Sequence, residues 1–251
     1  MKSELNYFAH QVENIKYPPV ILLHGAGGFH LSWPPTIRRM QEHAIYALDL
    51  CGHGKSKGDG WKNIDEHVND VVQFMNSLGL KQVALTGHSM GGAIALSLAV
   101  QHPELVSSLI LISTGSKLGV SPALLEAASR VETFPAAIEM LVENSFSRYA
   151  DARTRELTKQ RLLLTNPLTF HADLLACHAF NMQDSLPFIS VPTLVVCGSL
   201  DQMTPPKYSQ TLHDHIPNSK LEFIPNAGHM LMLERPDSVL QIMIDFLESQ
   251  E

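Results

Sequence analysis

The amino-acid sequence predicts an α/β protein with a mostly parallel sheet of about seven strands flanked by helices. Short apolar runs of five or six residues, bounded by Gly, Pro or polar residues, alternate along the chain with longer helical patterns. Runs of this kind are typical of strands that are buried on both faces of a parallel sheet. Hydrophobic residues make up 45% of the 251 residues and charged residues 17%. These are the proportions of a packed globular protein, and they exclude a disordered chain.

Six of the expected strands are rich in Val, Ile and Leu. They are Val20–His24, Ile45–Asp49, Gln82–Gly87, Ser108–Ile112, Thr193–Gly198 and Lys220–Ile224. Ser3–Val12 alternates only loosely, which predicts an edge strand. Between the strands, Ile64–Leu78 carries apolar residues at a spacing of three to four and is followed by Gly79, a residue that commonly terminates helices. A last helix is expected to begin near Pro236.

Residues 115–190 interrupt the alternation of strands and helices. The segment is rich in Ala, Leu and Glu, is punctuated by prolines and contains no good strand pattern. It is too long for a loop and too apolar for a linker, so it must pack on something. We predict a helical cap inserted between two strands, over the edge of the sheet where open α/β folds bind ligands. Residues 1–114 and 191–251 would then form the core. A helical decoration packed elsewhere is the alternative.

Charge and apolar run length exclude two classes of partner. Lys and Arg number 18 against 25 Asp and Glu, giving a net charge of −7, and no basic cluster stands out. Nucleic acid is therefore not an expected partner. The longest apolar runs are far shorter than the roughly 20 residues that span a bilayer, so no membrane span is expected.

Three cysteines, Cys51, Cys177 and Cys197, are too few and too scattered for a disulfide framework. With no charged-then-apolar leader at the N-terminus, we expect a reduced, cytoplasmic protein. His213 and His215 flank an aspartate but lack a third ligand nearby, so we expect a solvated surface and no metal. The oligomeric state is left open.

One serine stands at a sharp turn. Ser89 follows the strand Gln82–Gly87, precedes a helical run and lies between Gly87 and Gly91. In this strand–turn–helix context a serine hydroxyl projects above the edge of the sheet, and the glycines allow the flanking segments to approach closely. The helix behind the serine points its positive end at the place where negative charge would develop. The alternative is an ordinary N-cap serine in a glycine-rich turn.

Two further residues stand where a serine nucleophile needs them. Asp201 follows the strand Thr193–Gly198, and His229 follows the strand Lys220–Ile224. A serine hydroxyl needs a base within hydrogen-bonding distance and a third group that orients the base. Because the carboxyl ends of parallel strands share one edge of a sheet, we expect Ser89, Asp201 and His229 to meet there as a catalytic triad.

A glycine-rich loop, His24-Gly25-Ala26-Gly27-Gly28, follows the first buried strand. It could turn the N–H of Ala26 toward the serine, and the N–H of Met90 would be the second donor to an oxyanion. The alternative is a phosphate-binding loop. The chain lacks the Lys-Ser/Thr pair of a P-loop, and the glycines do not complete the spacing of a dinucleotide-binding loop.

These motifs together resemble the α/β-hydrolase family over nearly the whole chain. The matching segments are His24-Gly25, Asp49-x-x-Gly52-His53-Gly54-x-Ser56, Gly87-His88-Ser89-Met90-Gly91-Gly92, Asp201 with Pro205, and Gly228-His229. The resemblance implies an α/β-hydrolase fold, and it implies roles for five residues. They are Ser89 as nucleophile, His229 as general base and then acid, Asp201 as the residue that orients His229, and Ala26 and Met90 as oxyanion donors. His53 and Ser56 match a structural loop of the family. The family's first strand is expected to be missing, because only about 19 residues precede the first buried strand.

The predicted function is hydrolysis of carboxylic esters of small to medium acyl chain, through an acyl-enzyme on Ser89 and without a cofactor. A small-molecule ester would be the partner, and activity should fall in acid as His229 is protonated. Residues that could line an apolar acyl pocket are Phe29, His30, Phe134, Phe146 and Met182, although the cap members could equally serve in core packing. Glu234 could be mistaken for the catalytic acid, but its place before Arg235 and Pro236 predicts a charge at the start of a helix.

Three alternatives use the same fold. A lactonase would apply the triad to a cyclic ester, including acyl-homoserine or enol lactones. A hydrolase of carbon–carbon bonds or a cofactor-free perhydrolase would also use a Ser-His-Asp site. The third is a small-molecule receptor that keeps the fold and uses the pocket for binding alone.

Overall fold

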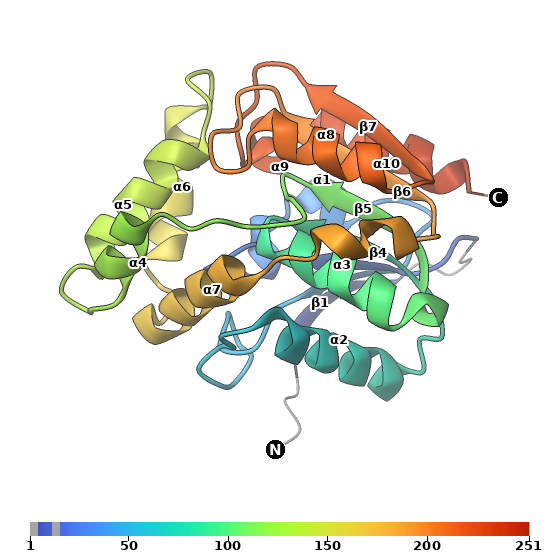
Figure 1. The fold of residues 1–251 in the computed structure, drawn as a ribbon, viewed down its shortest axis with the longest axis horizontal. Coiled ribbons are helices and arrows are strands. Elements are labelled where there is room, and N and C mark those ends of the chain that lie inside the picture. The colour runs from blue at the N-terminus through green and yellow to red at the C-terminus, as the bar shows by residue number, and fades with distance from the viewer. Residues whose placement is uncertain (1–4, 12–15, 251) are drawn as a thin grey trace.

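The computed structural model describes residues 5–11 and 16–250, and its centre is a seven-stranded sheet (Figure 1). The strands are β1 (Tyr7–His10), β2 (Val20–Leu23), β3 (Ile45–Leu48), β4 (Val83–His88), β5 (Val106–Ile112), β6 (Thr193–Gly198) and β7 (Ser219–Ile224). Their order across the sheet is β1-β3-β2-β4-β5-β6-β7. All neighbours are parallel except β1 and β3, so the predicted mostly parallel sheet is confirmed.

The predicted edge strand is present as β1, which pairs with β3 alone. Residues 3, 4 and 12 of that prediction lie outside the described part of the chain. Within the described residues, β1 is the only strand that precedes β2.

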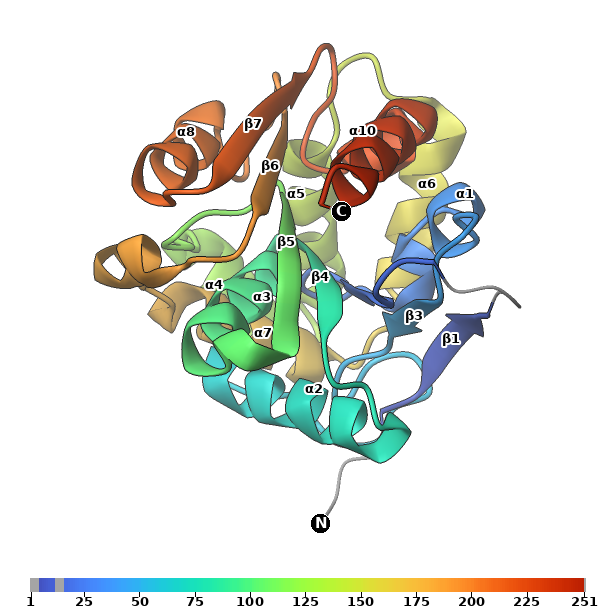
Figure 2. The same cartoon turned by 90° about the vertical axis from the view of Figure 1, so that its right-hand side faces the viewer.

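Helices cover both faces of the sheet. They are α1 (Pro35–Arg38), α2 (Ile64–Leu78), α3 (Met90–Gln101), α8 (Pro206–His215), α9 (Leu231–Glu234) and α10 (Pro236–Glu248). Three short 3-10 helices are η1 (His30–Ser32), η2 (Pro103–Leu105) and η3 (Gln183–Phe188). Figure 2 shows α2, α3 and α8 on one face and α1 and α10 on the other. The bounds of α2 follow from its caps. Asn63 accepts a hydrogen bond from the N–H of Glu66, and Gly79 ends the helix at φ 66°.

The core is divided by the sheet into two layers. Along β2, Ile21 and Leu23 pack with α3, whereas Val20 and Leu22 pack with α1 and α10, and all four are fully buried. This alternation follows from the two-residue period of a strand. Because both faces are covered by helices, the strand is apolar at every position, which is why the sequence showed continuous apolar runs.

The segment 115–190, which we call the cap, lies between β5 and β6. Its helices are α4 (Pro122–Ala128), α5 (Phe134–Ser145), α6 (Ala152–Leu162) and α7 (Pro167–Ala179), and they stand beside one end of the sheet (Figure 1). They have a small core of their own, in which the rings of Phe134 and Phe170 meet edge to face at a centroid distance of 5.7 Å. Within the described residues no helix is long and apolar enough to cross a membrane.

Candidate active site

Ser89 occupies a strained turn between β4 and α3. Its backbone angles are φ 53° and ψ −116°, a conformation that costs free energy in any residue with a side chain. The surrounding main chain fixes it there. The Ser89 N–H donates to the carbonyl of Ile112 at 3.0 Å, and its own carbonyl accepts from the Thr114 hydroxyl at 2.8 Å. The Ser89 hydroxyl makes no hydrogen bond within the described residues, and the residue lines a cavity.

Glycine is required on both sides of this turn. A Cβ at Gly87 would lie 2.2 Å from the carbonyl oxygen of Gly91, and a Cβ at Gly91 would lie 2.2 Å from the carbonyl oxygen of Leu23. Both obstacles are main-chain atoms, which cannot rotate away. The two glycines therefore allow β4, α3 and the end of β2 to meet closely enough to expose the serine.

Asp201 and His229 come together from the loops after β6 and β7. The His229 Nδ1 lies 3.0 Å from the Asp201 carboxylate, and both residues are buried. The carboxylate also accepts from the Thr204 hydroxyl at 2.8 Å and from the N–H groups of Met203 and Thr204 at 2.9 Å each. These three groups orient the carboxylate toward the imidazole.

Asp201 stays ionised despite its burial. Burial by itself would raise the pKa of this carboxyl, but the His229 charge and the hydrogen bonds from His229 and Thr204 outweigh it and lower the pKa to about 2. An ionised carboxylate only accepts hydrogen bonds, so His229 Nδ1 carries the proton of this hydrogen bond. Its Nε2 is then free to act as a base.

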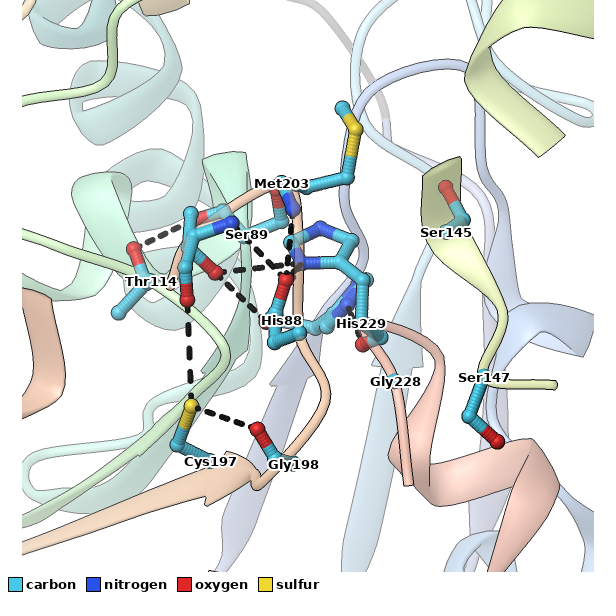
Figure 3. A network of polar contacts seen from close by, with 12 residues as sticks. His88, Ser89, Thr114, Ser145, Ser147, Cys197, Gly198, Met203, Gly228 and His229 are labelled. Carbon is cyan, nitrogen blue, oxygen red and sulfur yellow. Dashed lines mark hydrogen bonds and ion pairs between the residues drawn. The ribbon is translucent and has the colours of Figure 1, made fainter. Parts of the chain in front are cut away.

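Ser89 and His229 line the same cavity. Figure 3 shows these two residues close to each other and to His88. No hydrogen bond joins the Ser89 hydroxyl to the His229 imidazole. Such bonds are often long or poorly aligned in a substrate-free enzyme and tighten when substrate binds. His88 supports the base, because its Nε2 lies 3.0 Å from the His229 carbonyl oxygen. Burial, followed by the charge of His229, lowers the pKa of His88 to about 3, so His88 is a neutral donor.

Several main-chain N–H groups near the serine have no hydrogen-bond acceptor within the described residues, among them those of Ala26 and Met90. Met90 is the first residue of α3 and has no acceptor within its helix. In the glycine-rich loop, the N–H of Gly27 donates to Asp173 and that of Gly28 to the carbonyl of Gly25, whereas the N–H of Ala26 has no partner within the described residues. Within the described residues the N–H groups of Gly25 and Gly91 have no acceptor either, so the hydrogen bonds are compatible with the predicted donors, Ala26 and Met90, without singling them out.

The cavity has a volume of about 340 Å³ and lies between the core and the cap. Most of the side chains that line it are apolar, among them Leu124, Met140, Leu141, Phe146, Met230 and Leu233. Arg161 is the only Lys, Arg, Asp or Glu among the lining residues. Of the five residues predicted for an acyl pocket, Phe29 and Phe146 line this cavity.

The other three residues do not line the cavity, because hydrogen bonds or apolar contacts hold their side chains elsewhere. His30 turns away because its N–H and its Nδ1 both lie 2.8 Å from the Asp49 carboxylate. Phe134 is used in the core of the cap, and Met182 packs against the α3 side of the sheet. The prediction for these three residues is corrected accordingly.

Glu234 lies directly before the N-cap of α10, where it was predicted, but it also makes contacts that the prediction did not include. It ends α9, and its carboxylate accepts from the Ser147 hydroxyl of the cap at 2.5 Å and from the Gly228 N–H at 2.9 Å. It therefore links the cap to the residue before His229, which no local sequence signal indicated. Within the described residues no cluster of His, Cys, Asp and Glu could hold a metal ion, and all three cysteines are buried and unpaired.

Comparison with known proteins identifies the fold family of the chain. The family model for the alpha/beta hydrolase fold matches residues 18–236. A pimeloyl-(acyl-carrier protein) methyl ester esterase of Vibrio vulnificus (strain YJ016) is 25% identical and aligns with 91% of this chain and 94% of its own. A thermophilic esterase from Thermogutta terrifontis, solved with malate bound, is 27% identical with a TM-score of 0.90, over 99% of this chain and 94% of its own. Est816, described as an N-acyl homoserine lactone degrading enzyme, is 27% identical with a TM-score of 0.86, over 97% of each chain. The chain belongs to the alpha/beta hydrolase fold family.

Proposed function

We propose that the protein hydrolyses carboxylic esters through an acyl-enzyme on Ser89. One observation carries the proposal. A nucleophile elbow and a histidine bound to an ionised aspartate line one cavity, although Ser89, Asp201 and His229 are remote in sequence. The N–H groups of Ala26, in the glycine-rich loop, and of Met90, at the start of α3, have no acceptor within the described residues.

The chemistry follows from these positions. Ser89 Oγ attacks the ester carbonyl while His229 Nε2 takes its proton, and the imidazolium then donates that proton to the departing alcohol. Water, deprotonated by His229, attacks the acyl-enzyme, and Ser89 leaves with the proton. Asp201 stabilises the imidazolium in both halves of the reaction. The N–H groups of Ala26 and Met90 bind the oxyanion of each tetrahedral intermediate, and such a donor contributes roughly 2.7–4 kcal/mol.

The size and lining of the cavity support esters of small to medium acyl chain. A volume of about 340 Å³ is at the lower end for ligand pockets, and its wall is mainly apolar. Each methylene that the cavity buries should contribute about 0.8 kcal/mol, which is roughly a fourfold change in kcat/KM. The chain-length preference should rise by such steps and stop where the cavity is full.

A lactone is the second candidate substrate. The similarity to an N-acyl homoserine lactone degrading enzyme, at 27% identity over nearly the whole chain, supports it. A lactone is a cyclic ester, so the same attack on the carbonyl applies and only the shape of the cavity would select between ring and chain.

The test is turnover by the parent protein and by Ser89→Ala. The panel contains p-nitrophenyl esters of two to twelve carbons, γ-lactones and homoserine lactones. We expect multiple turnover by the parent on short or medium esters and a loss of at least a thousandfold in Ser89→Ala. Retention of activity within tenfold by Ser89→Ala would contradict the proposal. Inert esters with hydrolysed lactones would favour the second candidate, and slow single turnover would favour a receptor.

A further inference from the structure

Two residues of the cap form hydrogen bonds to Gly27 in the glycine-rich loop, one at its N–H and one at its carbonyl. The Gly27 N–H donates to Asp173 Oδ2, in α7, at 2.8 Å. The Gly27 carbonyl accepts from the hydroxyl of Thr165, in the turn between α6 and α7, also at 2.8 Å. Gly27 directly follows Ala26, the proposed oxyanion donor. The two cap residues therefore fix the backbone next to that donor.

Apolar side chains of the cap also pack against Gly27. Gly27 has φ 68°, and a Cβ there would lie 2.9 Å from the Phe170 ring and 3.2 Å from Leu162. Phe170 is fully buried in the core of the cap. The loop and the cap are therefore in direct contact at Gly27, with no room for a side chain between them.

Asp173 is suited to hold an N–H group because its charge is balanced. It is fully buried, and the same Oδ2 lies 2.8 Å from His53 Nε2. His53 Nδ1 lies 3.0 Å from the Cys51 carbonyl oxygen, so both ring nitrogens face acceptors and both carry a proton. In agreement, the pKa of His53 is raised, because the charge and hydrogen bond of Asp173 outweigh the burial that lowers it. A hydrogen bond from an N–H to an ionised carboxylate is about twice as strong as one to a neutral acceptor.

The Asp173 bond affects which N–H groups of the glycine-rich loop lack an acceptor. In the loop after Gly25, Asp173 takes the N–H of Gly27 and the carbonyl of Gly25 takes that of Gly28, which leaves the N–H of Ala26. The Asp173 bond fixes the Ala26–Gly27 peptide and the Thr165 bond fixes the Gly27–Gly28 peptide, so together they limit how far the backbone can shift on the C-terminal side of Ala26.

We propose that Asp173 and Thr165 are positioning residues for the oxyanion hole, so that the cap takes part in catalysis as well as covering the cavity. This inference rests on the proposed function, since it concerns the same site. It predicts that loss of either bond weakens binding of the transition state more than binding of the ester.

Thr165 offers a matched pair of variants. Thr165→Val removes the hydroxyl at nearly constant volume, and Thr165→Ser keeps it. Asp173→Asn removes the charge at constant shape. For each variant kcat and KM are measured on p-nitrophenyl butyrate, together with the Kd of butylboronic acid, which adds to the serine and places an oxygen in the oxyanion hole. We expect Thr165→Val and Asp173→Asn to lower kcat at least tenfold and to weaken the boronate at least tenfold, with KM within threefold. Thr165→Ser should stay within twofold of the parent.

Two controls separate positioning from loss of stability. Val239→Ala creates a cavity in α10, outside the cap, where the side chain is fully buried, and it should lower the urea midpoint without changing kcat. Circular dichroism shows whether Asp173→Asn folds, and if it does not, the Thr165 pair decides. Equal losses in Thr165→Val and Thr165→Ser, or kcat and boronate Kd within twofold of the parent in Thr165→Val, would overturn the inference. Turnover by Ser89→Ala, or a parent that binds no boronate, would instead overturn the proposed function.

Discussion

Replacing Gly91 by alanine should separate the serine from the oxyanion loop. The new Cβ would stand 2.2 Å from the Leu23 carbonyl oxygen and 2.8 Å from that of His24, whereas a real Cβ keeps at least 3.0 Å. The contact must therefore open by about 0.8 Å. Leu23 ends β2 and leads directly into the glycine-rich loop, so the serine and the Ala26 N–H move apart by a similar amount. A misplacement of about 1 Å can cost roughly a hundredfold in rate.

The assay is kcat/KM on p-nitrophenyl butyrate beside urea unfolding. We expect Gly91→Ala to lose roughly a hundredfold in kcat/KM and, through overpacking, about 1–3 kcal/mol of stability. Gly79→Ala is the control. At Gly79 no atom lies within 4 Å of an added Cβ, but φ is 66°, so this variant should lose about 1–2 kcal/mol of stability and no activity. Activity of Gly91→Ala within threefold of the parent would refute the reasoning.

Three further predictions concern the acid, the cap and the buried histidines. Asp201→Asn should lower kcat by roughly 10⁴-fold at pH 7 with little change in KM, because an amide no longer fixes the His229 tautomer. Stopped-flow measurement of acylation tests this. A loss below tenfold would contradict the role of Asp201 in orienting His229. Phe170→Ala should cost about 3–5 kcal/mol in urea unfolding, since the ring is fully buried against Phe134; a cost below 1 kcal/mol would show that the cap repacks. Burial, followed by nearby charges, sets the pKa of His88 to about 3 and that of His67 to about 4, below the ordinary 6.5. The unfolded chain therefore binds more protons, and stability is complete above pH 6.5 and falls as the pH drops toward 4, by about 1.4 kcal/mol per pH unit for each histidine. Urea unfolding between pH 7 and 4.5 checks this, and His67→Leu should flatten the slope; an unchanged slope would contradict it.

The cap is joined at two places to the loops that carry the proposed catalytic residues. Asp173 and Thr165 bond Gly27, next to the proposed oxyanion donor, and Ser147 bonds Glu234 and the carbonyl of Asn226, in the loop that leads to His229, the proposed base. In the proposed mechanism, the cap is thus linked physically to the loop of the oxyanion donor and to the loop of the base. Changes in the cap are expected to alter kcat as well as substrate preference.

The strands and the local surroundings of Ser89, Asp201 and His229 were predictable from the sequence. A strand buried on both faces must be apolar at every position, and an exposed serine between a strand and a helix needs glycines beside it. Once the strands are parallel, their carboxyl ends share one edge, so three remote residues can be brought together from local patterns alone.

Only the tertiary structure decided how the cap sits on that edge. Phe134 and Phe146 both pack in the core of the cap, but only Phe146 also lines the cavity. Asp173 meets Gly27 across 146 positions of the chain, and Thr165 meets the same residue across 138. Contacts of this kind depend on the angle and rotation at which whole helices pack. Those are set by the sum of many weak apolar contacts, and no short stretch of sequence encodes them.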